Sequence, residues 1–159
     1  MTDPRSAVQQ QIFAFHPLLE IWQMTVSERC AMLALLEALR PACAIEIGTA
    51  QGGSLAVLSH FAGRVYSIDP NASCREQLSG RFPNVEFLTG YSQDLLPGLI
   101  DSLQSHVQPL EFVLIDGDHR REAVSHDIEM VLRYQPRRPL TIVMHDSFHP
   151  ECRAFFPEQ

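Results

Sequence analysis

The chain has 159 residues, of which 45% are hydrophobic, and its formal net charge at pH 7 is −7. This length fits one domain with its own core and is too short for two ordinary ones, so we predict a single domain over residues 1–159. The negative charge argues against nucleic acid as a partner, because non-specific affinity for phosphate backbones comes mainly from clustered basic side chains. No run approaches the roughly 20 apolar residues of a membrane span, so we expect a soluble protein without a membrane partner.

The four cysteines are widely spaced, at Cys30, Cys43, Cys74 and Cys152, and form no C-x-x-C pair. A zinc site or a disulfide framework needs tighter clustering. No apolar signal segment comes before them. These features predict reduced thiols in a cytoplasmic protein.

Residues 1–40 are expected to form an N-terminal helical segment. The first 24 residues mix apolar and polar groups without a clean period and predict a helix or a lid. Thr25 and Glu28 then have the spacing of a capping box, in which each side chain bonds the backbone N–H of the other residue. Apolar residues recur at helical spacing after them, so we predict a helix that ends at Pro41.

Short β-branched, aliphatic and aromatic runs follow Pro41 and predict five strands, at 43–48, 64–69, 85–90, 111–117 and 140–146. Helical patterns separate these runs, at 54–61, 73–81, 95–106 and 119–134. Strands that alternate with helices form parallel βαβ units. We therefore predict an α/β fold with a doubly wound parallel sheet in the strand order 3-2-1-4-5.

The stretch "EIGTAQGGS", Glu46 to Ser54, places three glycines behind the first predicted strand. A dinucleotide-binding loop requires G-x-G-x-x-G, but Thr49 and Ala50 follow Gly48 here, and the middle glycine is missing. A P-loop requires Gly-Lys-Ser/Thr, and no lysine follows Gly53. The loop therefore suits a ligand with a nucleoside and an amino-acid tail but no phosphate.

The second predicted strand ends in Asp69, 21 positions after Gly48. A carboxylate at this place in a doubly wound sheet takes up the ribose hydroxyls of a nucleoside. The alternative is that Asp69 and Pro70 only end the strand and start a turn. The combination of this aspartate with the glycine loop favours the nucleoside site.

Five motifs together suggest a family: "AIEIGTAQGGS", "YSID", "TGYS", "LIDGDHRREAVSHDIE" and "VMHDS". Over residues 44–147 the chain resembles the class I S-adenosylmethionine-dependent methyltransferases, which have a Rossmann-like sheet. It is most similar to small-molecule O-methyltransferases such as the macrocin and novobiocin sugar methyltransferases, and more distantly to cephalosporin hydroxylase-like proteins. The resemblance implies a donor-binding core over 41–147 and methyl transfer to a hydroxyl of a small molecule.

The resemblance also implies which residues bind S-adenosylmethionine. The loop would surround the methionine portion, with Glu46 nearby; Asp69 would hold the ribose, Tyr91 and Ser92 would border the adenine, and Asp116 would lie against the donor. The loop residues are Gly48, Thr49, Gly52, Gly53 and Ser54.

Acidic residues and histidines gather at the ends of the last two predicted strands. Asp116, Asp118 and His119 lie at the end of the fourth strand, and His145 and Asp146 lie at the end of the fifth. These strand ends neighbour each other in a parallel sheet and face the ligand crevice. Carboxylates brought together must be neutralised by a proton, a base or a metal, and oxygen-rich sites suit Mg²⁺ or Mn²⁺.

By resemblance, Asp116 and Asp146 would be metal ligands, with His145 at a position that is more usually acidic. Asp118 matches a proposed general base, and His119 is its local substitute. The alternative is that Asp116 and Asp118 only make a turn around a glycine and that His119 opens the next helix.

Only twelve residues follow Ser147. Methyltransferases of this class usually continue with a helix and an antiparallel β-hairpin, so we predict that this hairpin is lacking and that the chain is a fragment or a reduced form. A second hypothesis is therefore a non-catalytic donor-binding or assembly module. Without the hairpin, the strand at 140–146 would lie at an open sheet edge. We expect this edge to be covered either by the C-terminal tail or by a second copy of the chain. A second copy there would make the protein a homo-oligomer.

Overall fold

Helices and strands alternate through residues 22–105 and 109–147, which are the residues described by this computed structural model. The elements are α3 (Val26–Leu39), β1 (Cys43–Ile47), α4 (Gly53–Phe61), β2 (Arg64–Asp69), α5 (Ala72–Leu78), β3 (Val85–Thr89), α6 (Ser92–Ser105), β4 (Leu110–Ile115), α7 (Arg121–Arg133) and β5 (Thr141–Met144). The predictions for residues 1–21, and those for residues 148–159, lie outside the described residues.

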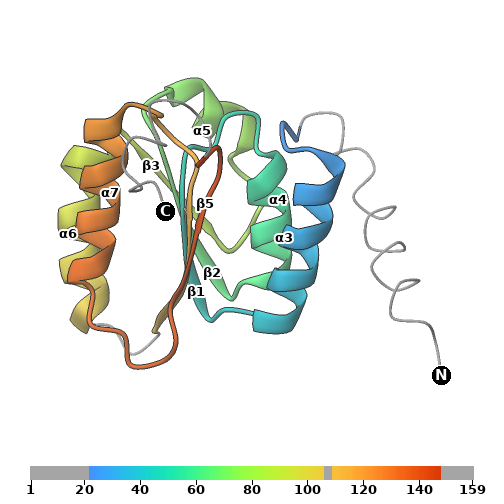
Figure 1. Ribbon diagram of the computed structural model, residues 1–159. Helices are drawn as coiled ribbons and strands as arrows, with labels where there is room; N and C mark the ends of the chain where they lie inside the picture. The colour runs from blue at the N-terminus through green and yellow to red at the C-terminus, as the bar shows by residue number, and fades with distance from the viewer. Residues whose placement is uncertain (1–21, 106–108, 148–159) are drawn as a thin grey trace.

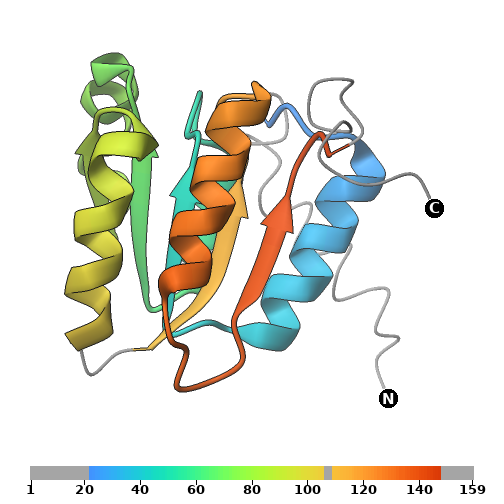
Figure 2. The same ribbon diagram turned by 60° about the vertical axis from the view of Figure 1, so that its left-hand side comes forward.

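The five strands form one sheet in the order β3-β2-β1-β4-β5, and every neighbouring pair is parallel. Figure 2 shows the strand arrows pointing the same way, with β5 at one end of the sheet. The predicted α/β class, the doubly wound sheet and the order 3-2-1-4-5 are confirmed. Since all the strands are parallel, their carboxyl ends meet at a single edge of the sheet.

Helices cover both faces of the sheet, with α3 and α4 on one side and α6 and α7 on the other (Figure 1). Successive side chains of a strand point to opposite faces, so β1 contributes to two cores. Ala44 belongs to the core under α3 and α4, whereas Ile45 and Ile47 belong to the core under α6 and α7. Burial on both faces explains why β1 is buried along its whole length.

The capping box at the start of α3 is confirmed. The Glu28 amide donates to Thr25 Oγ1 over 3.4 Å, and the Thr25 amide donates to Glu28 Oε2 over 2.7 Å. The helix ends at Leu39, and Arg40 takes a left-handed conformation with φ of 40° just before Pro41.

Three predicted helix boundaries are corrected by a few residues. Helix α5 ends at Leu78 instead of residue 81, because Ser79 already has a non-helical ψ of 134° and Gly80 follows with a φ of +81°. Helix α6 begins at Ser92 instead of residue 95 and accommodates Pro97 near its start. Helix α7 begins at Arg121 instead of residue 119, since the Asp118 side chain accepts a hydrogen bond from the Arg120 amide in a turn before the helix.

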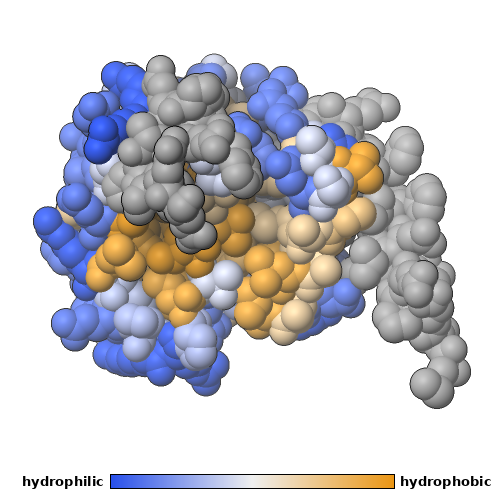
Figure 3. Space-filling view, viewed as in Figure 1, coloured by the Kyte–Doolittle hydropathy of each residue, from blue (hydrophilic) through white to orange (hydrophobic). Residues whose placement is uncertain are grey.

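Strand β5 pairs only with β4 among the described residues, and no described strand is antiparallel to its neighbour. A groove of about 450 Å³ lies between α3 and this edge, and its apolar lining includes Met32, Leu35 and Val143. Figure 3 shows apolar side chains gathered across this face of the molecule. Within the described ranges, no helix is long and apolar enough to cross a membrane.

Candidate active site

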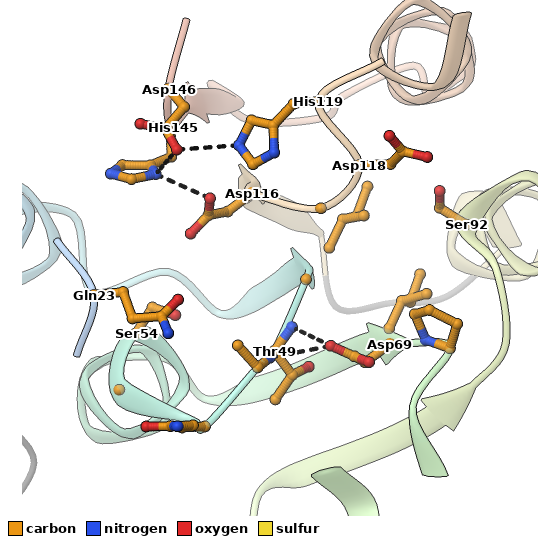
Figure 4. A pocket seen from close by; sticks show the side chains of 18 of the residues that line it. Gln23, Thr49, Ser54, Asp69, Ser92, Asp116, Asp118, His119, His145 and Asp146 are labelled. Carbon is orange, nitrogen blue, oxygen red and sulfur yellow. Dashed lines mark hydrogen bonds and ion pairs between the residues drawn. The ribbon is translucent and has the colours of Figure 1, made fainter. Parts of the chain in front are cut away.

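A pocket of about 540 Å³ lies at the carboxyl ends of β1, β2, β4 and β5. Its walls come from six separate parts of the chain, which Figure 4 shows converging. They are residues 22–24 before α3, the glycine loop after β1, residues 68–70 at the end of β2, residues 91–93 at the start of α6, and the segments 116–119 and 145–146 after β4 and β5. The pocket thus brings together every predicted site residue except Glu46 and Gly52.

Gly48 lets the glycine loop cross closely over the end of β4. A Cβ atom at this position would lie 2.1 Å from the Asp116 carbonyl oxygen, and the φ of +91° is one that only glycine adopts readily. The Gly48 amide also donates to the Ile68 carbonyl over 2.9 Å. Gly48 therefore holds the loop against β4 on one side of β1 and against β2 on the other.

Asp69 holds the glycine loop from the pocket side. Its Oδ2 accepts hydrogen bonds from the amides of Thr49, at 2.9 Å, and Ala50, at 3.0 Å. Its Oδ1 accepts one from the Asn71 amide at 2.8 Å. A carboxylate can accept about four hydrogen bonds, so capacity remains for a ligand hydroxyl. The ribose-binding role of Asp69 stays a prediction, and the structure adds loop anchoring to it.

Glu46 supports the same loop from beneath. It is fully buried, its Oε1 accepts a hydrogen bond from the Ser54 hydroxyl at 2.7 Å, and its Oε2 accepts one from the Ser67 hydroxyl at 3.5 Å. The Ser67 hydroxyl in turn hydrogen bonds the Thr49 hydroxyl. Burial raises the Glu46 pKa to about 8. The chain Ser54–Glu46–Ser67–Thr49 therefore links both sides of the loop through a carboxyl group that keeps its proton at neutral pH.

Ser92 and Tyr91 line the far side of the pocket, beyond Asp69. The Ser92 side chain is buried, whereas Tyr91 is 60% exposed. Behind Ser92 lies Asp127 of α7, which is only 1% exposed and which the sequence analysis missed. Burial raises the Asp127 pKa, and a hydrogen bond from the Ser92 hydroxyl opposes that rise. The sequence feature that could have revealed Asp127 was an aspartate on the apolar face of a predicted helix, three residues after Val124.

Four side chains form a cluster at the ends of β4 and β5 (Figure 4). His145 Nδ1 lies 3.0 Å from Asp116 Oδ1 and 3.3 Å from Asp146 Oδ2. His119 Nε2 lies 3.1 Å from the same Asp146 oxygen. The predicted meeting of these two strand ends is confirmed by the pairing of β4 with β5.

The charges in this cluster shift two protonation equilibria. Burial raises the pKa of Asp116, and the attraction of His145 offsets only part of that rise. For His145, burial opposes protonation, yet the charges of Asp116, Asp146 and Glu28 together raise its pKa. Glu28 takes part because its Oε2 lies 3.6 Å from His145 Nε2. The cluster thus favours a positive charge among its carboxylates.

The same cluster offers a set of metal ligands. One oxygen each from Asp116 and Asp146 and one ring nitrogen of His119 all lie within 4.8 Å of one another. The sequence predicted His145 as the third ligand, whereas the geometry groups His119 with the two carboxylates. Two carboxylates and an imidazole fit Mg²⁺ through their oxygens and Mn²⁺ through both ligand types.

Asp118 faces away from this ligand set and is held by Arg120. Its Oδ1 accepts a hydrogen bond from the Arg120 amide at 2.9 Å, and its Oδ2 accepts one from Arg120 Nε at 2.7 Å. These bonds lower the pKa of Asp118. Asp118 therefore makes the turn that the alternative interpretation expected, and it also lines the pocket as an ionised carboxylate.

A parallel sheet of this order, with a glycine loop after β1 and a carboxylate at the end of β2, has the arrangement of the class I S-adenosylmethionine-dependent methyltransferase fold. The profile of a methyltransferase-domain family matches residues 45–147. The chain belongs to this family. No curated protein matches the chain.

Solved structures share the fold at low sequence identity. Cofactor-bound Rv0187 from MTB is 24% identical, with a TM-score of 0.60 over 90% of this chain and 65% of that one. The O-methyltransferase from Bacillus cereus, in complex with SAH (S-adenosylhomocysteine), is 19% identical, with a TM-score of 0.62 over 91% of this chain and 66% of that one. MycE methyltransferase from the mycinamycin biosynthetic pathway, with Mg and SAH, is 16% identical, with a TM-score of 0.52 over 75% of this chain and 32% of that one. This chain thus spans about two-thirds of the length of the first two.

Proposed function

We propose that the protein transfers the methyl group of S-adenosylmethionine to a hydroxyl of a small molecule. One observation carries the proposal: the glycine loop with Asp69 and the cluster of Asp116, His119 and Asp146 line a single pocket. A donor held by the former would have its reactive end beside the latter. Membership of the methyltransferase-domain family supports the same activity.

In this proposal the donor lies along the carboxyl ends of β1 and β2. Backbone N–H groups of the glycine loop, at the start of α4, hold the methionine carboxylate, as helix N-termini hold anions. The free lone pair of Asp69 accepts a ribose hydroxyl, and Tyr91 and Ser92 border the adenine. The neighbours solved with bound SAH support this assignment.

Asp116, Asp146 and His119 would hold a divalent cation, with His145 fixing the two carboxylates through Nδ1. A cation there supplies a positive charge that lowers the pKa of a bound hydroxyl. Support comes from the ligand set of this chain and from the Mg in the MycE neighbour. Mg²⁺ is our first choice, because two of the three ligands are carboxylates. Mn²⁺ is our second choice, because the imidazole ligand favours a softer ion.

The acceptor oxygen attacks the methyl carbon in line, the new O–C bond forms as the C–S bond breaks, and S-adenosylhomocysteine leaves. The hydroxyl proton passes to Asp118, which lines the same pocket. The low pKa of Asp118 makes it a weak base, which suffices if the hydroxyl has already been acidified. In a site without a cation, His119 takes the proton instead. The pocket supplies alignment, which carries most of the rate enhancement for a donor that is already reactive.

A second function, a non-catalytic donor-binding or assembly module, is favoured by one observation. Strand β5 is an edge strand among the described residues and borders an apolar groove. The acceptor half would then be absent, and a second copy of the chain could pair with this edge in a homo-oligomer. Light scattering tests the homo-oligomer, and enzyme turnover tests the module.

The experiment combines donor binding with turnover. We expect calorimetry to detect S-adenosylhomocysteine binding in Mg²⁺ and in chelator alike, and radiolabelled methyl transfer to a panel of hydroxylated small molecules in Mg²⁺ only. Asp116→Asn and Asp146→Asn should lower transfer at least a hundredfold and leave donor affinity within a few-fold. Asp101→Asn, an exposed site on α6 outside the pocket, is the control.

Three results would contradict parts of this proposal. Full activity in excess chelator would show that no metal takes part in the reaction. Donor binding without turnover on any acceptor favours the module. An absence of donor binding overturns both functions.

A further inference from the structure

Residues Trp22, Gln23 and Met24, here called the strap, form a wall of the donor pocket immediately before α3. Trp22 is 3% exposed and Met24 is 6% exposed, whereas Gln23 is exposed. Figure 4 shows the Gln23 side chain on the same side of the pocket as Ser54. The strap thus buries two side chains in the protein and offers the third to the pocket.

The strap lies directly on the start of α4. A Cβ atom at Gly53 would lie 2.4 Å from Trp22 Cα and 2.5 Å from Trp22 Cβ, which are distances that real atoms do not tolerate. Gly53 therefore permits the strap to touch the glycine loop. Any displacement of the strap would open the pocket at the end where the loop binds the donor.

One side chain, that of Arg29, fastens the strap. Arg29 Nε donates a hydrogen bond to the Met24 carbonyl at 2.7 Å, and Arg29 Nη2 donates to the Trp22 carbonyl. The guanidinium carbon also lies 5.7 Å from the centroid of the Trp22 ring, within cation–π range. Arg29 itself is fixed on the first turn and a half of α3, whose start is held by the Thr25–Glu28 capping box.

We propose that Arg29 is a positioning residue for donor binding, which clamps the strap over the glycine loop so that Gln23 faces the ligand. The inference rests on the proposed function for the identity of the ligand, but the clamp itself does not. A planar guanidinium can donate to two carbonyls and stack on an indole at the same time. A lysine ammonium is a single point of charge on a flexible stem, so Arg29→Lys should keep the charge and lose the clamp.

Trp22 is the only tryptophan in the sequence, so its fluorescence reports on the strap directly. We expect Arg29→Lys to raise the acrylamide quenching constant of the free protein at least twofold and to shift the emission to longer wavelength. In the same variant, the dissociation constant for S-adenosylhomocysteine should rise about tenfold. Gln23→Ala should weaken the same binding without altering the quenching.

Arg40→Lys is the matched control, because Arg40 belongs to the C-cap of α3 and its guanidinium lies 5.4 Å from the Phe61 ring, away from the pocket. It should leave the quenching constant and the dissociation constant within twofold of the parent, even if its melting temperature falls as much as that of Arg29→Lys.

Equal quenching in the parent and Arg29→Lys would overturn the clamp. Increased quenching with unchanged affinity would overturn the role in donor binding. If the parent itself does not bind S-adenosylhomocysteine, the proposed function fails, and the quenching measurement still decides whether Arg29 holds the strap.

Discussion

The buried carboxyl group of Glu46 leads to a quantitative prediction about pH. Its pKa is raised from an ordinary 4.5 to about 8 by burial. Between these values the unfolded chain loses the Glu46 proton while the folded protein keeps it, so the free energy of unfolding falls as the pH rises. One pKa unit corresponds to about 1.4 kcal/mol, which gives a loss of about 5 kcal/mol across the whole interval.

Glu46→Gln isolates this contribution. The amide has the shape of the protonated carboxyl and cannot ionise. Its oxygen can still accept from the Ser54 hydroxyl, and its NH2 group would donate to the Ser67 hydroxyl, which would no longer donate to residue 46. At pH 5 the carboxyl is already mostly ionised in the unfolded chain but still protonated in the folded protein, so we expect the variant to be the more stable by only about 1 kcal/mol. At pH 8 the variant should be the more stable by about 4 kcal/mol.

The assay is urea unfolding at pH 5, 6, 7 and 8, followed by circular dichroism, for the parent and the variant. Glu76→Gln is the control, because Glu76 is an exposed residue of α5 and its substitution should leave the pH dependence unchanged. If the free energies of the parent and Glu46→Gln change in parallel from pH 5 to pH 8, the proton is not on Glu46 and the reasoning fails. The variant should also bind S-adenosylhomocysteine within a few-fold of the parent, since the hydrogen-bond chain beneath the loop is kept.

Three further predictions concern two residues of the pocket wall and Asp127, which lies behind Ser92. Gly48→Ala should destabilise the fold by about 3 kcal/mol or more, measured by thermal unfolding, because its Cβ would lie 2.1 Å from the Asp116 carbonyl oxygen. Asp69→Ala should weaken S-adenosylhomocysteine binding by about 1–3 kcal/mol in calorimetry, since the Thr49 and Ala50 amides lose their acceptor; unchanged binding would remove Asp69 from the site. Asp127→Asn should raise the free energy of unfolding at pH 8 by about 1 kcal/mol, because it removes a buried group that must otherwise ionise or hold a proton; lower stability would show that the charge is needed.

The sheet and its strand order could be predicted because the strands are short, strongly apolar runs that alternate with helical segments. The run "CAIEI" of β1 is buried at every position, as a central strand covered by helices on both faces must be. Once the alternation of strands and helices is recognised, the handedness of βαβ units leaves few orders for five strands. Helix ends were less predictable, because they depend on individual backbone conformations such as the non-helical ψ of Ser79 after α5.

The candidate site could be predicted only where the topology alone brings residues together. Strand ends converge in a parallel sheet, so the meeting of Asp116 with Asp146 needed no knowledge of side chains. Asp127 and Arg29 were missed because each acts on a segment through the direction of its side chain. An arginine in the first turns of a helix is usually interpreted as a solvent-exposed residue. Nothing in the sequence shows that Arg29 turns back to hydrogen bond the two carbonyls of the strap.

The acidic residues in and beneath the pocket show why counting carboxylates in a sequence does not assign their roles. Glu46 is fully buried and keeps its proton, so it can serve as a neutral support for the glycine loop. Asp118 is bonded by Arg120 and stays ionised, so it is a weak base at best. Asp116 is buried beside a histidine whose pKa is raised, an arrangement that accepts either a proton or a cation. In the sequence these three acids lie at or near the ends of predicted strands. Only their burial and partners show which one supports the loop, which one is bound in a turn and which one can hold a positive charge.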